Sequence, residues 1–290
     1  MKTELERKIG RAIRLIKMSA PEDGSPIEVA YSGGKDSDVI LQLAKEAGVN
    51  YRAIYKNTTI DPAYTRKHAL DMGAEVLMPK DSFFSLIEKN GLPSHLFRFC
   101  CRVLKEYKVL DKAIIGVRRA ESKSRASRYT EPTECKYYGS KKPENHVEAI
   151  YPILDWTDDD IEAFILDRGI KCAPLYYDEE GRFHVERRLG CMCCPLASRK
   201  KRIEQFKMYP NMVKAYIKHA QVFMDTHPDR GILVRNGYKD AYEWFVRDVF
   251  YLSQEDWNKH KEEISQLGIF WGGQNEDYKT MLEDYFNIKF

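Results

Sequence analysis

The sequence lacks several features that would place it at once in a class of protein. No apolar run among its 290 residues approaches the roughly 18 needed to cross a bilayer. The first residues alternate acidic and basic side chains and hold no apolar stretch typical of a secretory signal. The formal net charge is only +3, and neither an internal repeat nor a low-complexity segment is present. We therefore expect a cytoplasmic globular protein with no membrane partner.

The apolar segments that are present alternate between strand-like and helix-like spacing. Residues 27–31, 51–55 and 74–78 form short apolar runs, and residues 36–47 and 62–72 between them repeat at helical spacing. Such alternation predicts an α/β fold with a parallel twisted sheet and helices on both of its faces. Ligands in these folds bind beyond the carboxyl ends of the strands.

The remainder of the chain gives weaker signals. Helices are expected near residues 83–89 and 102–111, with a further strand at 113–116. Residues 119–147 are charged and Ser-rich, which predicts a mobile loop over the site. The chain after Cys194 looks mainly helical. We predict a nucleotide-binding domain with the cysteine cluster at 1–202 and a helical C-terminal region at 203–290.

A hexapeptide between the first predicted strand and the following helix predicts a nucleotide site. Two glycines allow the backbone to approach phosphate oxygens, and the helix N-terminus favours anions. The serines can donate hydrogen bonds to phosphate, the lysine can offset its charge, and the aspartate can hold Mg²⁺. The spacing is not that of a Walker loop. The residues are Ser32, Gly33, Gly34, Lys35, Asp36 and Ser37.

This hexapeptide resembles the pyrophosphate loop (PP-loop) of the ATP-pyrophosphatase, or adenine nucleotide alpha hydrolase-like, superfamily. The resemblance implies that ATP is cleaved between its α and β phosphates, that AMP joins an oxygen of the substrate, and that pyrophosphate leaves. It implies catalytic roles for Lys35 and Asp36, with ATP and Mg²⁺ as cofactors.

Further segments resemble the phosphoadenosine-phosphosulfate (PAPS) reductase branch of that superfamily, over about residues 25–200. A Thr-rich turn after the second strand implies that Thr58 and Asp61 lie near the nucleotide. Arg118 and Arg119 follow a later strand, and their guanidinium groups suit phosphate or sulfate oxygens. The other matching segments are 151–157, with Pro-x-x-Asp-Trp-Thr, 174–176 and 190–195.

Five of the seven cysteines fall in two tight groups. Cys100, Cys101, Cys191 and Cys194 form a CC…CxxC pattern whose four thiolates suit a [4Fe–4S] cluster or, as an alternative, Zn²⁺; unmetallated or plain buried thiols also stay open. The pattern resembles the adenylylsulfate (APS) reductases and, most closely, the ATP-dependent sulfurtransferases of DNA phosphorothioation. Cys193, inside the second group, is a candidate catalytic carrier of sulfur.

The reductases that this chain resembles carry a cysteine in a Cys-Gly-x-His-like tail. Here the last cysteine is Cys194, so the resemblance favours sulfur transfer over reduction.

A basic run bears on the partner of the protein: residues 182–202 hold seven Lys or Arg and one Glu. Such a cluster suits the phosphates of DNA or RNA, and a solvated helix start is the alternative.

The sequence therefore predicts an ATP-dependent sulfurtransferase that adenylates an acceptor, with nucleic acid as the leading candidate, and inserts sulfur while releasing AMP and PPi. A cysteine desulfurase is the expected type of sulfur donor. One alternative is an APS/PAPS reductase that forms sulfite, and another is a nucleotide-binding sensor subunit of a defence or modification complex. A homo-oligomer and a subunit of a larger complex are both open as assemblies.

Overall fold

The computed structural model describes residues 3–94, 97–250 and 277–290. It divides the chain into two compact units. Unit 1 comprises Met1–Lys80 and Cys101–Cys191, and unit 2 comprises Asp81–Cys100 and Met192–Phe290. The chain therefore changes unit at 191/192, whereas the expected division near residue 203 falls within helix α8 (Arg199–Met208) and stays a prediction.

Unit 1 is built on a six-stranded sheet with the order β3-β2-β1-β4-β6-β5. Strand β1 pairs in parallel with β2 and β4, and β6 pairs in parallel with β4. Strand β5 alone among these six runs antiparallel, against β6. The predicted α/β class with a mostly parallel sheet is confirmed. The strands are β1 (Ile27–Tyr31), β2 (Tyr51–Lys56), β3 (Glu75–Leu77), β4 (Lys112–Ile114), β5 (Thr133–Tyr137) and β6 (His146–Ile150).

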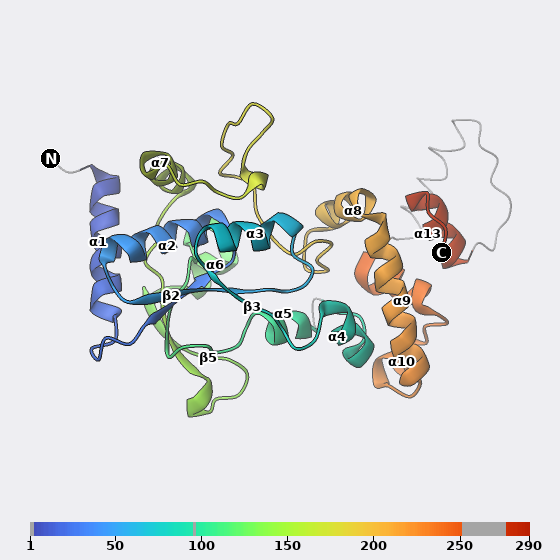
Figure 1. Ribbon diagram of the computed structural model, residues 1–290. Helices are drawn as coiled ribbons and strands as arrows, with labels where there is room; N and C mark the ends of the chain where they lie inside the picture. The colour runs from blue at the N-terminus through green and yellow to red at the C-terminus, as the bar shows by residue number, and fades with distance from the viewer. Residues whose placement is uncertain (1–2, 95–96, 251–276) are drawn as a thin grey trace. The chain divides into compact units, whose positions relative to one another are not determined.

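Helices flank this sheet, and α2 and α3 lie along one of its faces (Figure 1). Helix α2 turns Val39, Ile40 and Leu43 into the core, where each is fully buried, because these positions share one helical face. Gly48 ends α2 in the left-handed conformation, as glycine commonly does. The helices with residues in unit 1 are α1 (Glu4–Ser19), α2 (Lys35–Ala47), α3 (Ala63–Asp71), α5 (Phe99–Leu104), α6 (Lys123–Arg128) and α7 (Asp158–Arg168).

The prediction that residues 119–147 form a loop is wrong. The segment contains the 3-10 turn Arg119–Glu121, helix α6, strand β5, the 3-10 turn Pro143–Asn145 and the first residues of β6. Strand β5 is the outermost strand, and its side chains alternate between exposed and half-buried. An edge strand of this kind carries few apolar residues, so hydrophobic patterning does not reveal it.

Unit 2 is helical, as predicted for the chain after Cys194. Its core is aromatic: the Phe206 ring makes edge-to-face contacts with Tyr216, Phe245 and Phe250. The described helices are α4 (Phe83–Asn90), α8, α9 (Pro210–Thr226), α10 (Gly231–Asn236), α11 (Ala241–Phe245), the π-helical turn η4 (Val246–Phe250) and α13 (Tyr278–Phe286). In neither unit is any described helix long and apolar enough to span a bilayer.

Candidate active site

The predicted pyrophosphate loop, residues 32–37, connects β1 directly to α2. Gly34 occupies the N-cap position of α2 and, as a glycine, has no side chain that could bond the first N–H groups of the helix. The Ser37 hydroxyl donates to the Gly34 carbonyl at 2.6 Å, and the Ser32 and Ser37 Oγ atoms lie 3.3 Å apart. The first N–H groups of a helix lack intrahelical acceptors, so this turn offers an anion site at the carboxyl end of β1.

Gly33 is required at its position for two reasons. Its φ is +76°, which L-residues with a side chain rarely adopt. A Cβ atom at this position would also lie 2.7 Å from Cγ2 of Thr65 on α3. Gly33 therefore lets the loop pack directly against α3.

Gly33→Ala should disrupt ATP binding beyond the effect of backbone strain alone. Gly24→Ala is the matched control, because Gly24 has a φ of +74° and nothing within 4 Å of the added Cβ. Backbone strain should destabilise both variants by about 1–2 kcal/mol, but only Gly33→Ala, with its added contact to Thr65, should weaken ATP binding, by roughly tenfold or more. Calorimetric titration and thermal unfolding of both variants measure this. Equal ATP affinity in the two variants would contradict the prediction.

Lys35 and Asp36 lie together at the start of α2. The Lys35 side chain is almost fully buried, and its Nζ atom lies 3.3 Å from Asp36 Oδ2 and over the ring of Tyr176. Asp36 Oδ1 also accepts from Arg118 Nε at 2.7 Å. Two cations thus hold the Asp36 carboxylate. Carboxylate oxygens are also the ligands that Mg²⁺ uses beside phosphates, so Asp36 fits the predicted metal.

Arg118 is only 1% exposed and joins three segments of unit 1. Besides Asp36, it donates to Asp158 Oδ1 at 2.7 Å and to the Trp156 carbonyl at 3.3 Å. Asp158 is the first residue of α7, which Thr157 caps through the Asp160 N–H. The Pro-x-x-Asp-Trp-Thr segment therefore supports Arg118, and through it Asp36.

Arg119 lies apart from Asp36 and bonds a different set of groups. Its Nε atom donates to the Tyr129 carbonyl at 2.7 Å, its guanidinium pairs with Asp155, and its backbone N–H donates to the Leu154 carbonyl. Both arginines thus bond protein acceptors in this structure. The roles of Arg118 and Arg119 as phosphate ligands remain predictions.

Thr58 and Asp61 form a turn after β2 that lies beside a predicted metal ligand. Asp61 Oδ2 accepts from the Tyr55 hydroxyl at 2.8 Å and from the Thr58 N–H at 3.2 Å. The Cys191 thiol donates to Thr58 Oγ1 at 3.7 Å. Unit 1 therefore brings one cysteine of the second group to the turn that is predicted to lie near the nucleotide.

Lys105, just after α5, belongs to the same cluster and was missed in the sequence. Its Nζ atom lies 3.9 Å from Asp61 Oδ1. Desolvation acts to lower the pKa of Lys105, although its side chain is 41% exposed, but Cys191, Asp61 and Cys101 together act to raise it, and the net effect is an increase. A lysine that stays protonated beside thiols favours their thiolate forms. Lys105 lies four residues after Cys101, so helical spacing could have pointed to it, but only the fold brings Asp61 and Cys191 to it.

The four predicted metal ligands are shared between the units. Cys101 and Cys191 belong to unit 1, where both lie near Lys105, and Cys100 and Cys194 belong to unit 2. Their combination in one cluster, with iron–sulfur or zinc, stays a prediction. Thiolates are suitable ligands for either metal.

Cys193 is fully buried in unit 2 and adopts a φ of +50°. Its N–H donates to Gln205 Oε1 at 3.1 Å, and its carbonyl accepts from the Tyr216 hydroxyl at 3.0 Å. Burial, with a contribution from Cys194, raises the pKa of the Cys193 thiol to about 12. This environment opposes a thiolate at neutral pH, and the predicted sulfur-carrying role of Cys193 stays a prediction.

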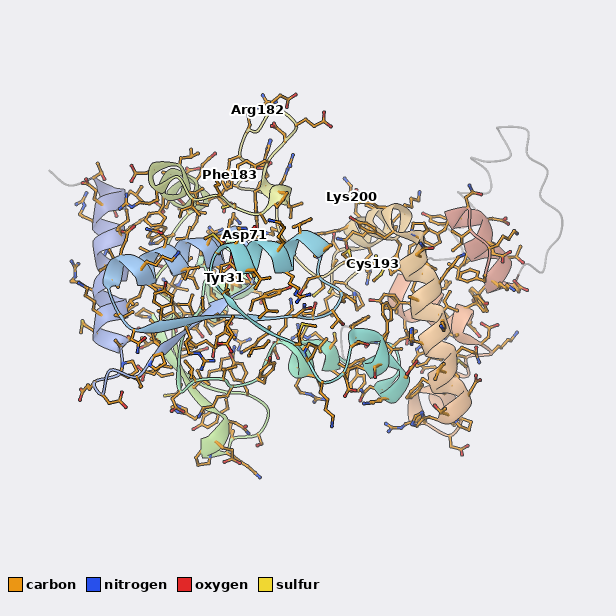
Figure 2. The ribbon with its side chains drawn as sticks, in the orientation of Figure 1. Tyr31, Asp71, Arg182, Phe183, Cys193 and Lys200 are labelled. Atoms are coloured by element: carbon orange, nitrogen blue, oxygen red, sulfur yellow. The ribbon has the colours of Figure 1, made fainter. Side chains whose placement is uncertain are left out.

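The basic run between residues 182 and 202 has both interior and surface members. Arg202 is buried and donates to the Pro195 carbonyl at 2.7 Å, and Arg187 donates to two backbone carbonyls. Lys200 on α8 is exposed, and Figure 2 shows its side chain extending outward from unit 2. Fewer charges than the sequence suggests therefore face solvent.

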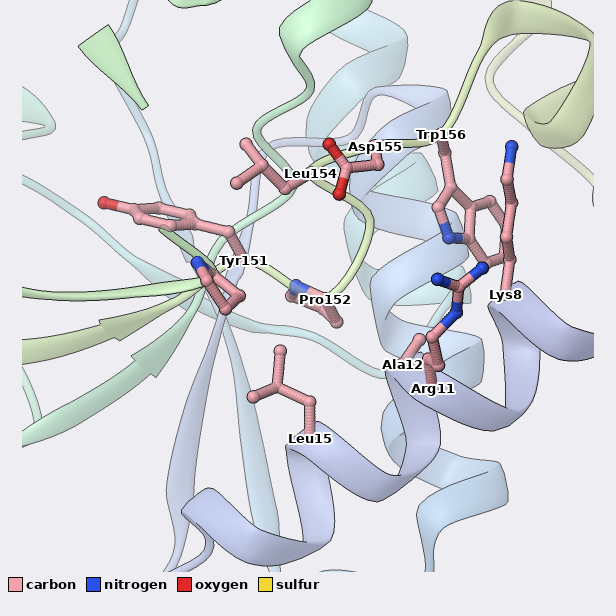
Figure 3. Close-up of a pocket in the computed structure, with 10 residues that line it drawn as sticks. Lys8, Arg11, Ala12, Leu15, Tyr151, Pro152, Leu154, Asp155 and Trp156 are labelled. Atoms are coloured by element: carbon pink, nitrogen blue, oxygen red, sulfur yellow. The ribbon is translucent and has the colours of Figure 1, made fainter. Parts of the chain in front are cut away.

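A pocket of about 270 Å³ lies against α1, on the segment that supports the two arginines (Figure 3). None of its lining residues belongs to the loop 32–37. Its lining includes Trp156, whose carbonyl accepts a hydrogen bond from Arg118. The lining residues are Lys8, Arg11, Ala12, Leu15, Pro132, Tyr151, Pro152, Leu154, Asp155 and Trp156.

The sequence profile of the phosphoadenosine phosphosulfate reductase domain matches residues 26–197. This range includes the loop, the turn after β2, both arginines and both cysteine groups. The chain belongs to the PAPS reductase domain family. The resemblance of the sequence to this branch is thereby confirmed, and the family is one of enzymes of the ATP-pyrophosphatase type.

Curated relatives of this PAPS reductase-family chain are about a quarter identical to it over the aligned residues. An uncharacterized protein of Methanocaldococcus jannaschii is 28% identical over 232 residues, which cover 74% of this chain and 52% of that protein. Sulfate adenylyltransferase subunit 2 of Caulobacter sp. is 28% identical over 208 residues, 61% of this chain and 68% of that subunit. The chain thus spans about half the length of the first of these relatives.

Solved structures similar to this PAPS reductase-family chain are distant. A tRNA thiolase of Methanococcus maripaludis, solved with its [4Fe-4S] cluster, has a TM-score of 0.39 and 17% identity, over 86% of this chain and 91% of the thiolase chain.

Proposed function

We propose that this protein is an ATP-dependent sulfurtransferase that adenylates an oxygen of a nucleic acid and replaces it with sulfur. The observation that carries the proposal is the proximity of a thiol to the nucleotide turn: Cys191 donates to Thr58 within unit 1. An anion-binding loop alone supports any adenylylation, whereas a thiol beside the turn after β2 supports sulfur chemistry.

The proposed reaction has two substitution steps. In the first, the acceptor oxygen attacks the α-phosphorus of ATP, the bond to the β-phosphate oxygen breaks, and pyrophosphate leaves. In the second, the terminal sulfur of a cysteine persulfide bonds to the activated acceptor atom, and AMP leaves with the former acceptor oxygen. A dithiol then reduces the remaining S–S bond, releasing the thiolated acceptor and the donor thiol.

Different residues carry out different parts of the proposed reaction. Lys35 and the N–H groups at the start of α2 bind phosphate oxygens, and Asp36 holds Mg²⁺. Cys100, Cys101, Cys191 and Cys194 are the proposed ligands of a [4Fe–4S] cluster, with zinc as the alternative. Positive charge at Lys105 partly offsets the thiolate charge.

The test uses anaerobically purified, iron-replete protein with Mg-ATP, cysteine, a cysteine desulfurase, a dithiol, and either tRNA or duplex DNA. We expect AMP and pyrophosphate in equal amounts, together with nucleosides or phosphodiesters that carry sulfur in place of oxygen by mass spectrometry. Absence of AMP and pyrophosphate with every nucleic acid would overturn the proposal.

A second candidate is an APS or PAPS reductase, which the family match favours. It predicts sulfite from a sulfonucleotide with thioredoxin as the electron donor, and no requirement for ATP. Measuring sulfite with and without ATP separates the two candidates. Tight ATP binding with no turnover in either assay would instead favour a nucleotide-sensing subunit.

A further inference from the structure

A buried polar cluster lies at the start of α2, next to the pyrophosphate loop. Asp38, in the first turn of α2, is 0% exposed. Its Oδ1 atom accepts from the Tyr31 hydroxyl at 2.5 Å, and His68 Nε2 lies 3.0 and 3.2 Å from its two oxygens. We call Tyr31, Asp38 and His68 the Asp38 cluster.

Members of the Asp38 cluster come from the same elements that shape the loop. Tyr31 is the last residue of β1 and directly precedes the loop; Figure 2 shows it inside unit 1. The Asp38 N–H donates to the Gly34 carbonyl at 3.0 Å. Helix α3, which carries His68, also carries Thr65, the residue that confines Gly33. The carboxylate therefore ties together the strand and the two helices that border the loop.

The burial of Asp38 is difficult to explain by stability alone. Removing a carboxylate from water is costly, and apolar residues of similar volume often replace buried charged pairs with no loss of stability. The hydrogen bonds to Asp38 are directional, however, and apolar packing would not reproduce them. A directional contact is useful where backbone N–H groups must be aimed at a ligand.

We propose that Asp38, together with Tyr31 and His68, positions the backbone of residues 32–37 to receive the phosphates of ATP. The inference rests on the proposed function for the identity of the ligand, but the positioning itself can be measured without nucleotide. Asp38 touches no phosphate in this role and acts through the loop. It is a positioning residue distinct from Lys35 and Asp36.

The test compares three variants by hydrogen–deuterium exchange of a peptide covering residues 31–38, without nucleotide, and by the kcat of pyrophosphate release. Asp38→Leu removes the acceptor, whereas Asp38→Asn keeps an oxygen for Tyr31 and His68. Glu28→Gln is the control, because Glu28 is another buried carboxylate of unit 1 and is bonded to Lys56 instead of the loop.

We expect Asp38→Leu to speed loop exchange by about tenfold and to lower kcat by up to about a hundredfold. Its dissociation constant for ATP should rise as well, because the loop that Asp38 positions binds the phosphates. Asp38→Asn should restore all three values most of the way to wild type, and Glu28→Gln should leave loop exchange unchanged. A merely structural role predicts no difference between the loop exchange of Asp38→Leu and that of Glu28→Gln.

Wild-type exchange in Asp38→Leu, or an Asp38→Asn variant as impaired as Asp38→Leu, would overturn the inference. If Asp38→Leu does not fold, Tyr31→Phe, which removes one hydrogen bond, is judged by the same exchange measurement. Wild-type protein that releases no pyrophosphate with any acceptor rejects the proposed function, and the exchange result still decides the positioning role.

Discussion

Lys35→Ala should lower the rate of AMP formation by about 10²–10³-fold, the range found when one preorganised charge or donor is removed from a developing anion. Lys35 is the buried cation at the start of α2, and its Nζ atom is held between Asp36 and the Tyr176 ring. Its charge is therefore held at the start of α2, where the phosphates are proposed to bind. The measurement is the AMP formed per minute at saturating ATP and acceptor.

Lys45→Ala is the matched control for this prediction. Lys45 is an exposed residue in the last turn of the same helix, so its removal changes the net charge equally but far from the loop. The control should retain wild-type activity. Similar losses in the two variants would show that general charge, and not the loop lysine, supports the reaction.

If the proposed function holds, Cys191→Ser should abolish metal binding at the proposed cluster site and, with it, sulfur transfer. Cys191 lies beside Thr58 and near Lys105 and Cys101, where serine would supply neither a thiolate nor the same affinity for iron. Wild-type protein purified without oxygen should contain about four irons and four sulfides per chain. The variant should contain close to none and lose the visible absorption of the cluster.

Cys135→Ser is the control, because it removes a thiol that is not a proposed metal ligand. Cys135 is an exposed residue of strand β5 and is not a predicted ligand, so this variant should keep its iron. Zinc in place of iron in the wild-type protein would favour the alternative, a zinc site, over the cluster. Full iron retention by Cys191→Ser would remove Cys191 from the ligand set.

The sequence was sufficient to predict β1, the loop after it and α2. An apolar run, the hexapeptide and an amphipathic helix are local signals, and the structure has β1, the loop and α2 at those places. The contact between Arg118 and Asp36 could not be predicted from the sequence, because the two residues are 82 positions apart. A guanidinium after a strand suits phosphate or carboxylate equally well, and only the fold shows which group it meets here.

The division of the chain was hard to predict for a similar reason. Residues 81–100 look like one more segment of the α/β pattern, yet they belong to unit 2. There Phe83 on α4 packs edge-to-face on Tyr216 of α9. Composition changes near residue 203, but packing between segments far apart in the chain determines the units. Helical periodicity shows that a helix has an apolar face, but it does not show which helix packs against that face.

The two outer strands of the sheet have a consequence for self-association. Exposed strand edges invite other chains to add strands, and short strands or inward-facing charges discourage this. Strand β3 is only three residues long, with Glu75 paired to Arg52. Strand β5 turns Glu134 and Lys136 toward the sheet, where both are half-buried. Unit 1 should therefore resist edge-to-edge aggregation, and a second copy or another protein that joins it should contact its helices and loops.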